Sequence, residues 1–301
     1  AIGAYSLYAN TTATKNTAVG YYALYANTTA GYNTGVGYEA LKTNTTGQIN
    51  TALGWGSLVD NTTGDNNVAI GASALANNTT ADNNTAVGKD ALLVNTIGTS
   101  NTAVGAEALD ANTEGNSNTA IGISTLGTNT TGSQNLAAGQ GALFANTTGG
   151  QNTGIGYFAL NANTTGGSNV AVGYNALDAN TTASSCTAVG RDAAGANTTG
   201  DANVALGRAA LLTNATGHMN TALGKDALRV NTASDNVAVG GGSLYANTTG
   251  TYNLAVGPGQ YGVTQGPLGT NTTGSFNTAL GLKSLLSNTT ASGNTALGSS
   301  V

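Results

Sequence analysis

Residues 16–20, Asn-Thr-Ala-Val-Gly, return as Asn-Thr-Gly-Val-Gly at 33–37 and as Asn-Thr-Ala-Leu-Gly at 50–54. The same phrase recurs with a period of seventeen residues along nearly the whole chain. One unit is a residue short, and a later one carries seven extra residues. A fixed short period is typical of a repeat protein in which each unit packs on its neighbours.

Each position of the unit has its own residue type, counting the Asn as position 1. Position 5 is always Gly, position 9 is almost always Leu, and position 12 is always Asn, usually followed by Thr-Thr and then Gly or Ala. Positions 6, 7, 10, 16 and 17 vary. Fixed positions between variable ones predict a coil in which the inward-facing residue types are constrained and the outward-facing residues can vary.

The pattern within a unit indicates strands and turns. A helical repeat needs roughly 30 or more residues, and Gly with Asn-Thr-Thr every seventeen residues would break a helix. Thr-Ala-Val-Gly alternates as a strand does, with positions 2 and 4 on one face and position 3 on the other. We expect Ala-Leu-x-x-Asn to form a second short extended run that carries Leu inward, with turns at position 5 and at positions 12 to 15.

The sequence therefore predicts an all-β fold, a single parallel β-solenoid or β-roll over residues 1–301 with about 17–18 coils. Ala at positions 3, 8 and often 11 would allow close approach, either across a narrow interior or between neighbouring chains. Stacked in register, the Asn amides of positions 1 and 12 can bond to the coils above and below. We expect structural ladders of this kind at Asn16, Asn33 and Asn50, and at Asn27, Asn44 and Asn61.

Composition excludes several classes of protein. The chain has 45 glycines, two prolines and 7% charged residues, with a net charge of −5. Glycine has no three-residue period, which excludes collagen, and no apolar run approaches the roughly 20 residues that cross a bilayer. Eight Lys and Arg residues spread along the chain form no basic patch, so we expect no nucleic-acid partner and no membrane insertion.

The units also resemble those of a known family. Phrases such as those at 67–71 and 169–173 resemble the Ser-Val-Ala-Ile-Gly repeat in the heads of YadA-like trimeric autotransporter adhesins. The longer phrase Asn-Thr-Ala-Val-Gly-x-x-Ala-Leu-x-x-Asn-Thr-Thr-Gly is similar to repeats of bacteriophage tail fibres and bacterial surface proteins. The resemblance implies a left-handed parallel β-roll in an extracellular, fibrous and homotrimeric protein.

A catalytic centre would depart from the repeat and bring an acid, a base or a nucleophile together. His218 lies at variable position 16 without a second His or Cys for a metal site. Cys186 takes the place of a ladder Asn, either as a buried small substitute or as an intermolecular or reactive thiol. We expect no enzyme, no metal and no cofactor. Acids recur at position 7, several after a cation, and are predicted to form a solvated face: Glu39, Asp90, Glu107, Asp192 and Asp226.

Aromatic columns and one insertion are the candidates for recognition. Tyr21, Tyr38 and Trp55 occupy position 6 of three successive units, and Tyr157 and Tyr174 repeat the arrangement. Such rings could bind a sugar or a partner protein, or they could stack on one another or pack at an interface between chains. The insertion, about 258–267, is predicted to bulge from the rod, and it could bind a partner or have no function. Its candidate residues are Pro258, Gln260, Tyr261, Gln265 and Pro267.

The most direct interpretation is a structural and adhesive extracellular fibre segment, of adhesin or tail-fibre type, without catalytic activity. Its partners would be copies of itself and a cell-surface glycan or protein. An alternative is an extracellular filament subunit, because the chain begins at position 3 and ends at position 8 without a polar cap, which would leave strand edges for end-to-end pairing. Glycan binding and ice binding are minor alternatives. The sequence leaves open the ligand, the number of copies, the handedness and the glycosylation of Asn-Thr-Thr.

Overall fold

The computed structural model describes residues 1–259 and 265–300. None of these residues is helical, so the described chain has no helix that could span a membrane. The described residues form seventeen strands of three residues each, all of them paired in parallel. The predicted all-β parallel solenoid with a seventeen-residue repeat is confirmed. The chain divides into two compact units, residues 1–151 and 152–301, and each is described by itself.

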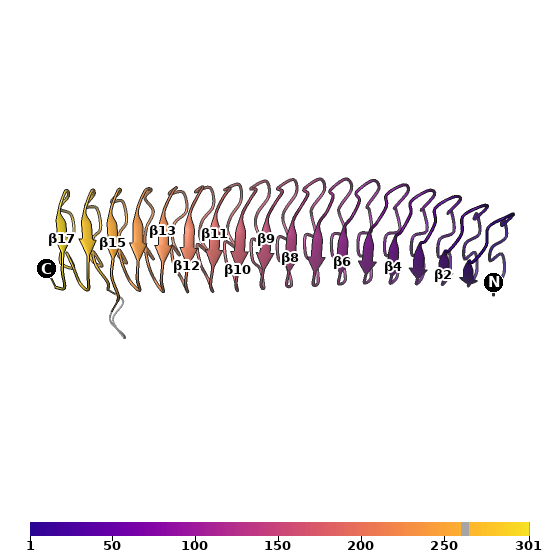
Figure 1. Ribbon diagram of the computed structural model, residues 1–301, viewed down its shortest axis with the longest axis horizontal. Coiled ribbons are helices and arrows are strands. Elements are labelled where there is room, and N and C mark those ends of the chain that lie inside the picture. The colour runs from indigo at the N-terminus through magenta and orange to yellow at the C-terminus, as the bar shows by residue number, and fades with distance from the viewer. Residues whose placement is uncertain (260–264, 301) are drawn as a thin grey trace. The chain divides into compact units, whose positions relative to one another are not determined.

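The first unit contains eight strands, and each pairs in parallel with the next along the chain. Thr17 lies opposite Thr34, and this seventeen-residue offset recurs at every pair. In Figure 1 each strand is a short arrow, followed by a circuit of turns that leads to the next arrow. The strands are β1 (Thr17–Val19), β2 (Thr34–Val36), β3 (Thr51–Leu53), β4 (Val68–Ile70), β5 (Thr85–Val87), β6 (Thr102–Val104), β7 (Thr119–Ile121) and β8 (Leu136–Ala138).

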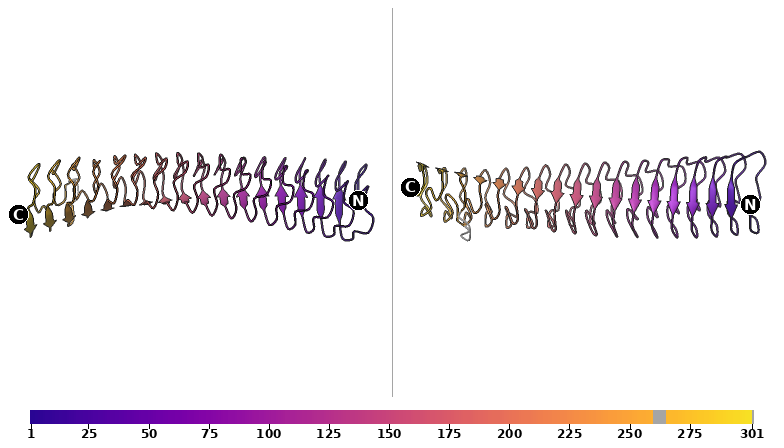
Figure 2. Two further views of the ribbon diagram at one scale, coloured as in Figure 1. Left: turned by 90° about the horizontal axis from the view of Figure 1, so that it is seen from above. Right: turned by 60° about the horizontal axis from the view of Figure 1, so that its bottom comes forward.

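The second unit repeats the arrangement with nine strands. Its sixteen-residue coil, which begins at Asn220, keeps the register, since Thr221 lies opposite Val237. The coil with the insertion also keeps the register, since Leu254 of β15 lies opposite Thr278 of β16, and the two views of Figure 2 show these strands following one another in the stack. The strands are β9 (Thr153–Ile155), β10 (Val170–Val172), β11 (Thr187–Val189), β12 (Val204–Leu206), β13 (Thr221–Leu223), β14 (Val237–Val239), β15 (Leu254–Val256), β16 (Thr278–Leu280) and β17 (Thr295–Leu297).

The interior of each coil is narrow because its strand turns an alanine or a glycine inward. In β6, Ala103 is buried, whereas Thr102 is half-buried and Val104 is exposed. The alanines of position 8 are buried as well, for example Ala91, and Leu92 follows it into the core. The small residues therefore serve close approach across the interior, and the larger aliphatic side chains of the strands face outward.

The segment after the strand is a turn, and the predicted second extended run is wrong. Leu24 and Leu41 have φ angles of 54° and 53°, and residues at positions 7 and 17 are also left-handed, as are Tyr22 and Tyr32. A left-handed conformation costs a non-glycine residue roughly 1–2 kcal/mol, whereas burial of a Leu side chain contributes about 1.5–3 kcal/mol. The fully buried Leu therefore offsets the cost of the tight turn that places it.

Glycine at position 5 is required by both its conformation and its surroundings. Gly88 has a φ of 140°, and a Cβ built on it would overlap the carbonyl oxygen of Gly105 in the next coil. Only glycine adopts such a φ without strain. The invariant position therefore sets how closely successive coils approach.

The insertion leaves the coil after position 6. The chain rejoins the coil before the end of the segment 258–267 that was predicted to protrude. Pro258 occupies position 6 and is exposed, whereas Gln265 is half-buried. Gln260 and Tyr261 lie outside the described residues. Pro267 was predicted to belong to the protruding loop, and this is wrong: it is buried at position 8, where its carbonyl accepts a hydrogen bond of 3.1 Å from the N–H of Leu244. Position 8 suits a proline because the N–H at this position makes only a long hydrogen bond in other coils, 3.4 Å from Ala91 to the carbonyl of Gly88, so little is lost when the donor is absent.

The glycine constraint predicts that Gly88→Ala lowers the free energy of unfolding by about 3 kcal/mol or more, through strained φ and overlap with the next coil. Gly56→Ala is the matched control, because Gly56 has a φ of 61° and nothing within 4 Å of the added Cβ. It should cost only about 1 kcal/mol. Chemical denaturation followed by circular dichroism measures both, and equal losses would contradict the close-approach argument.

Candidate functional site

The asparagines of position 12 form a side-chain ladder inside the coils. Asn44 Nδ2 donates to Asn27 Oδ1 at 3.1 Å, and Asn61 Nδ2 donates to Asn44 Oδ1 at 2.8 Å. Each amide also donates to the carbonyl three residues further on, such as that of Gly64. All three side chains are fully buried. Asn27, Asn44 and Asn61 therefore cannot carry an N-linked glycan in the folded chain, although each belongs to an Asn-Thr-Thr triplet.

The asparagines of position 1 form a second ladder that binds the backbone. The N–H of Asn33 donates to Asn16 Oδ1 at 2.8 Å, and the N–H of Asn50 donates to Asn33 Oδ1 at 2.8 Å. Asn33 Nδ2 donates to the carbonyl of Gly47 in the following turn. Each of these amides thus satisfies backbone groups at the entry to a strand, where an unpaired buried group would cost about 1–3 kcal/mol.

Two further ladders lie at positions that sequence reasoning treated as turn or as variable. The hydroxyl of Thr28 at position 13 donates to the carbonyl of Thr45 in the next coil. At position 16 the backbone N–H donates to a side chain of the next coil, as Asp65 does to Asp82 Oδ1 at 2.7 Å. His218 is such an acceptor, since its Nδ1 accepts a hydrogen bond from the N–H of Asp201. Asp, Asn and Ser are frequent at position 16, and this preference for short side chains with an acceptor oxygen could have predicted the ladder from the sequence.

The sixteen-residue coil interrupts the ladder of position 12. Asn231 Nδ2 donates to the carbonyl of Ala233, two residues on instead of three, and the Oδ1 of Asn214 is buried without a hydrogen-bond partner among the described residues. Beyond the break the ladder resumes, because Asn247 Nδ2 donates to Asn231 Oδ1 at 2.7 Å. The missing residue corresponds to position 14 and leaves one buried acceptor unpaired.

Cys186 replaces Asn in the ladder of position 1. Its N–H still donates to Asn169 Oδ1 at 2.9 Å, and its Sγ lies 3.2 Å from the carbonyl of Gly200, where an amide nitrogen would otherwise sit. The thiol is buried, and burial raises its pKa, while the backbone N–H of Asn203 lowers it to a smaller extent. The thiol therefore stays protonated at neutral pH and is poorly suited to act as a nucleophile.

The aromatic columns stack on themselves. The rings of Tyr21 and Tyr38 lie 5.6 Å apart at 17°, and those of Tyr157 and Tyr174 lie 5.5 Å apart at 9°. Trp55 is exposed, and the described ring contacts do not include one between Trp55 and Tyr38. Because stacked rings cover one another's faces, the columns present ring edges and hydroxyl groups to a ligand.

More tyrosines join the first column in a connected group that we call the tyrosine cluster. It consists of Tyr5, Tyr8, Tyr21, Tyr22, Tyr25 and Tyr38. Lys42 lies 5.5 Å from the ring of Tyr22 and forms an ion pair with Glu39. A hydrogen bond with Tyr21 is the main cause that raises the pKa of Tyr22. The cluster is the largest concentration of polar aromatic groups on the described surface.

Several acids of position 7 form ion pairs with neighbouring cations. Arg191 and Lys225 are 60% exposed, and each contacts the acid that follows it. The predicted solvated face is wrong at Asp226, whose side chain is only 3% exposed between Lys225 and Arg229. Asp226 is contacted from both sides, by Lys225 at position 6 and by Arg229 at position 10, which explains this burial, whereas Glu107 at position 7 of another coil is exposed. Burial also raises the pKa of Asp110 and Asp178.

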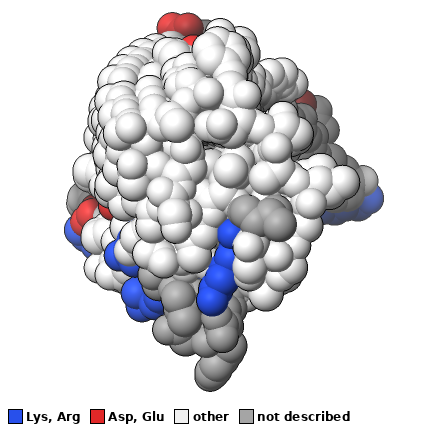
Figure 3. All heavy atoms as spheres, turned by 90° about the vertical axis from the view of Figure 1, so that its left-hand side faces the viewer, with Lys and Arg blue, Asp and Glu red and all other residues white. Residues whose placement is uncertain are grey.

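The outer sheet face, formed by positions 2 and 4 of the strands, carries no charge. These positions hold only Thr, Val, Leu, Ile or Ala in all seventeen strands. Leu53 and Ile121 are each 47% exposed. Figure 3 views the molecule from the left-hand side of Figure 1, where Lys, Arg, Asp and Glu side chains lie at separate places on a mostly uncharged surface. Each unit thus has a continuous row of aliphatic side chains in contact with water.

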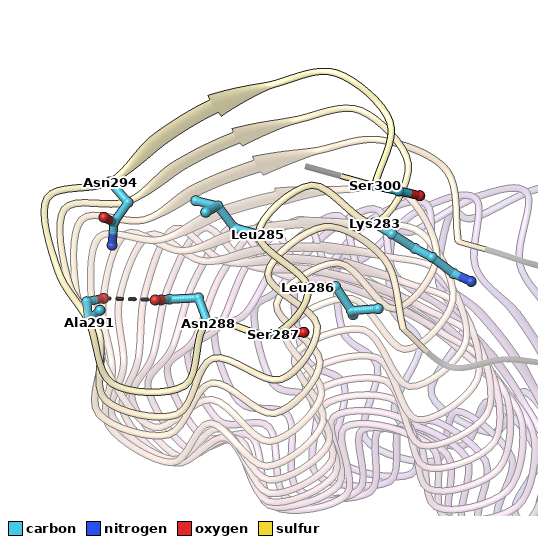
Figure 4. A pocket seen from close by; sticks show the side chains of 8 residues that line it. All are labelled: Lys283, Leu285, Leu286, Ser287, Asn288, Ala291, Asn294 and Ser300. Carbon is cyan, nitrogen blue, oxygen red and sulfur yellow. Dashed lines mark hydrogen bonds between the residues drawn. The ribbon is translucent and has the colours of Figure 1, made fainter.

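A pocket of about 480 Å³ is lined by residues of the turns between β16 and β17 and by Ser300, which follows β17. Figure 4 shows Leu285, Asn288 and Asn294 among its lining residues, with Asn288 bonded to Ala291. These residues occupy positions 9, 12 and 1, which are core positions in other coils. The pocket therefore includes interior space of the solenoid that is open at the last described coil.

Comparisons with known proteins give no relative. The chain matches no family model, no curated protein and no solved structure. Within residues 1–259 and 265–300, no group of three or more His, Cys, Asp or Glu side chains is placed to hold a metal ion.

The Cys186 site predicts a stabilising substitution. Cys186→Asn would restore an acceptor for the N–H of Asn203 and an amide donor for Gly200, and should raise the free energy of unfolding by about 1 kcal/mol. Cys186→Ala, which removes the sulfur without adding an amide, is the control and should bring no gain. Chemical denaturation compares the three chains, and an Asn variant no more stable than the Ala variant would argue against the ladder.

The interrupted ladder predicts a stabilising insertion. A Thr inserted between Thr232 and Ala233 should complete the coil and bring Asn231 Nδ2 within reach of Asn214 Oδ1, for a gain of about 1 kcal/mol. The control inserts a Thr between Thr181 and Thr182, which lengthens a regular coil of the same unit and should destabilise it. Thermal unfolding distinguishes them, and a loss of stability in both variants would refute the explanation.

Proposed function

We propose that this protein is a structural segment of an extracellular fibre, with no catalytic activity, and that copies of it associate side by side through the outer sheet face. The observation that carries this proposal is the uncharged outer sheet face, in which the aliphatic side chains of position 4 form a row beside the Thr and aliphatic residues of position 2, with Leu53, Ile121 and Leu206 each nearly half exposed. Contiguous apolar surface of this kind is typical of protein interfaces.

A second copy of the chain fits this face better than an unrelated partner does. Parallel strands are spaced by about 4.8 Å, so the side chains of one copy form ridges with the same spacing as those of another. Two equal spacings can interdigitate over many coils, whereas a partner with a different repeat falls out of register after a few. The resemblance to adhesin heads favours three copies around one axis.

The remaining surface suits a spacer that presents binding groups. Its hydrogen-bonding asparagines are enclosed in ladders, and its acids such as Glu39, Asp192 and Asp226 are held in ion pairs, which makes them poor general bases. The tyrosine columns and the ion-paired charges lie at positions 6, 7 and 10, away from the strands. They are therefore free to meet a cell-surface glycan or protein while the outer sheet face is covered by another copy.

The test is the mass in solution. Wild-type chain should form an oligomer, whereas the double variant Leu53→Lys and Ile121→Lys should fall to the monomer mass of 29.3 kDa, because burying unpaired ammonium groups is costly. The control, Thr63→Lys and Thr131→Lys, adds the same charge at exposed position 14 of the same two coils and should leave the mass unchanged. Light scattering after size-exclusion chromatography reads out all three.

A monomeric wild type, or equal dissociation of both double variants, would refute side-by-side assembly. A mass far above that of a small oligomer, retained by the strand-face variant, would instead favour end-to-end filaments. Turnover of a glycan that is lost on substitution of a single acid would refute the absence of catalysis.

A further inference from the structure

Four pairs of tyrosines stand at equivalent positions of adjacent coils with their rings parallel. The ring centroids of Tyr5 and Tyr22 are 5.1 Å apart at 15°, and those of Tyr8 and Tyr25 are 5.4 Å apart at 8°. The other two pairs are the position-6 columns described above, at 5.5–5.6 Å. Three of the four pairs belong to the tyrosine cluster.

The backbone holds each pair together. The N–H of Tyr22 donates to the carbonyl of Ala4 at 3.1 Å, and the carbonyl of Tyr25 accepts from the N–H of Ala9 at 3.0 Å. The two backbones of a pair are thus about one strand spacing apart, about 4.8 Å, and cannot separate without breaking the ladder. Side-chain rotation alone therefore suffices to bring the ring carbons together.

The rings are also open to reagents. Tyr5 is 51% exposed and Tyr8 is 66% exposed. Tyr22 and Tyr25 are half-buried beneath them. An oxidant in solution can therefore reach one ring of each pair, and its partner is already in place.

We propose that these pairs are sites of oxidative cross-linking, in which stacked tyrosines of adjacent coils become dityrosine when the chain meets a haem peroxidase with hydrogen peroxide. Each phenol gives one electron to the oxidant and its proton to water. The two phenoxyl radicals form one C–C bond between ring carbons ortho to the oxygens, and the hydrogens of those carbons move to the oxygens. The pair loses two hydrogen atoms, and one hydrogen peroxide becomes two water molecules.

The consequence is a covalent tie between coils that otherwise rely on hydrogen bonds. Each dityrosine closes a loop of one repeat, and closing a loop reduces the conformational freedom of the unfolded chain. Coils joined in this way should unfold at a higher temperature than coils that are not joined. The inference stands on the stacked rings and does not depend on side-by-side assembly.

The experiment treats dilute full-length protein with a haem peroxidase and hydrogen peroxide, then digests it with trypsin. Cleavage after Lys15 and Lys42 separates Tyr5 and Tyr8 from Tyr22 and Tyr25, so bonds between them join peptides 1–15 and 16–42. The joined species should have the summed peptide masses less two hydrogens. Because the partners are pre-aligned, intrachain bonds should greatly exceed bonds between chains.

Tyr32 is the internal control, because it lies in the same tryptic peptide as Tyr22 and Tyr25. It is 55% exposed, and its hydroxyl accepts a hydrogen bond of 2.7 Å from Lys15 Nζ. Fragmentation spectra should place bonds at Tyr22 and Tyr25 on the order of tenfold more often than at Tyr32. In denaturant this preference should disappear. Tyr252, stacked on Phe276 at 5.0 Å, should not couple to it, because Phe276 has no phenol.

Variants complete the test. Tyr22→Phe with Tyr25→Phe keeps the stacked rings but removes two phenols, and should lower the yield of joined peptide on the order of tenfold, whereas Tyr32→Phe should leave it unchanged. Three results would overturn the proposal: bonds at Tyr32 as frequent as at Tyr22, products that are mainly covalent dimers, or no joined peptide while free N-acetyltyrosine couples in the same reaction.

Discussion

In-register stacking of coils is the constraint on which every other feature of this chain depends. A buried backbone amide or carbonyl without a partner is costly, and a coil of seventeen residues has few internal partners to offer. The chain meets this need with side chains of the neighbouring coils, chiefly the asparagines of positions 1 and 12. A ladder works only when the same side chain recurs at the same place, so the repeat in sequence follows from the hydrogen bonding.

The same constraint explains an interior with so little apolar volume. The strands turn alanines or glycines inward, and the main large side chain in the core is the Leu of position 9. A thin core contributes modest hydrophobic energy, and the tight turn around it requires left-handed conformations at several non-glycine residues. Stability must therefore come from the continuity of the ladders along each unit, where every added coil pairs groups left by the one before it.

Regular stacking also decides what the surface can do. Any side chain at a variable position meets its equivalent one strand spacing away, so identical residues in successive coils become columns. Tyrosines become stacked pairs in which each ring covers a face of the other. Cations lie beside acids with which they form ion pairs. Position 4 of the strands becomes an aliphatic row, and position 2 becomes a row of Thr and aliphatic side chains, both without charge. A departure from the repeat, such as the short coil at Asn220, appears as a local defect in one ladder while the strand register survives.

The sequence by itself determined the period, the strand of positions 2 to 4, the glycine of position 5 and the pairing of equivalent asparagines, because each depends on local alternation or on repetition along the chain. It also located the insertion, although not the return of Pro267 to the core. Only the tertiary structure decided that Ala103 and its equivalents face inward, that Leu24 sits in a left-handed turn, that position 16 supplies acceptors and that Asp226 is buried. These depend on how one coil closes and on which side of it the next coil lies, and no residue pattern within a single unit carries that information.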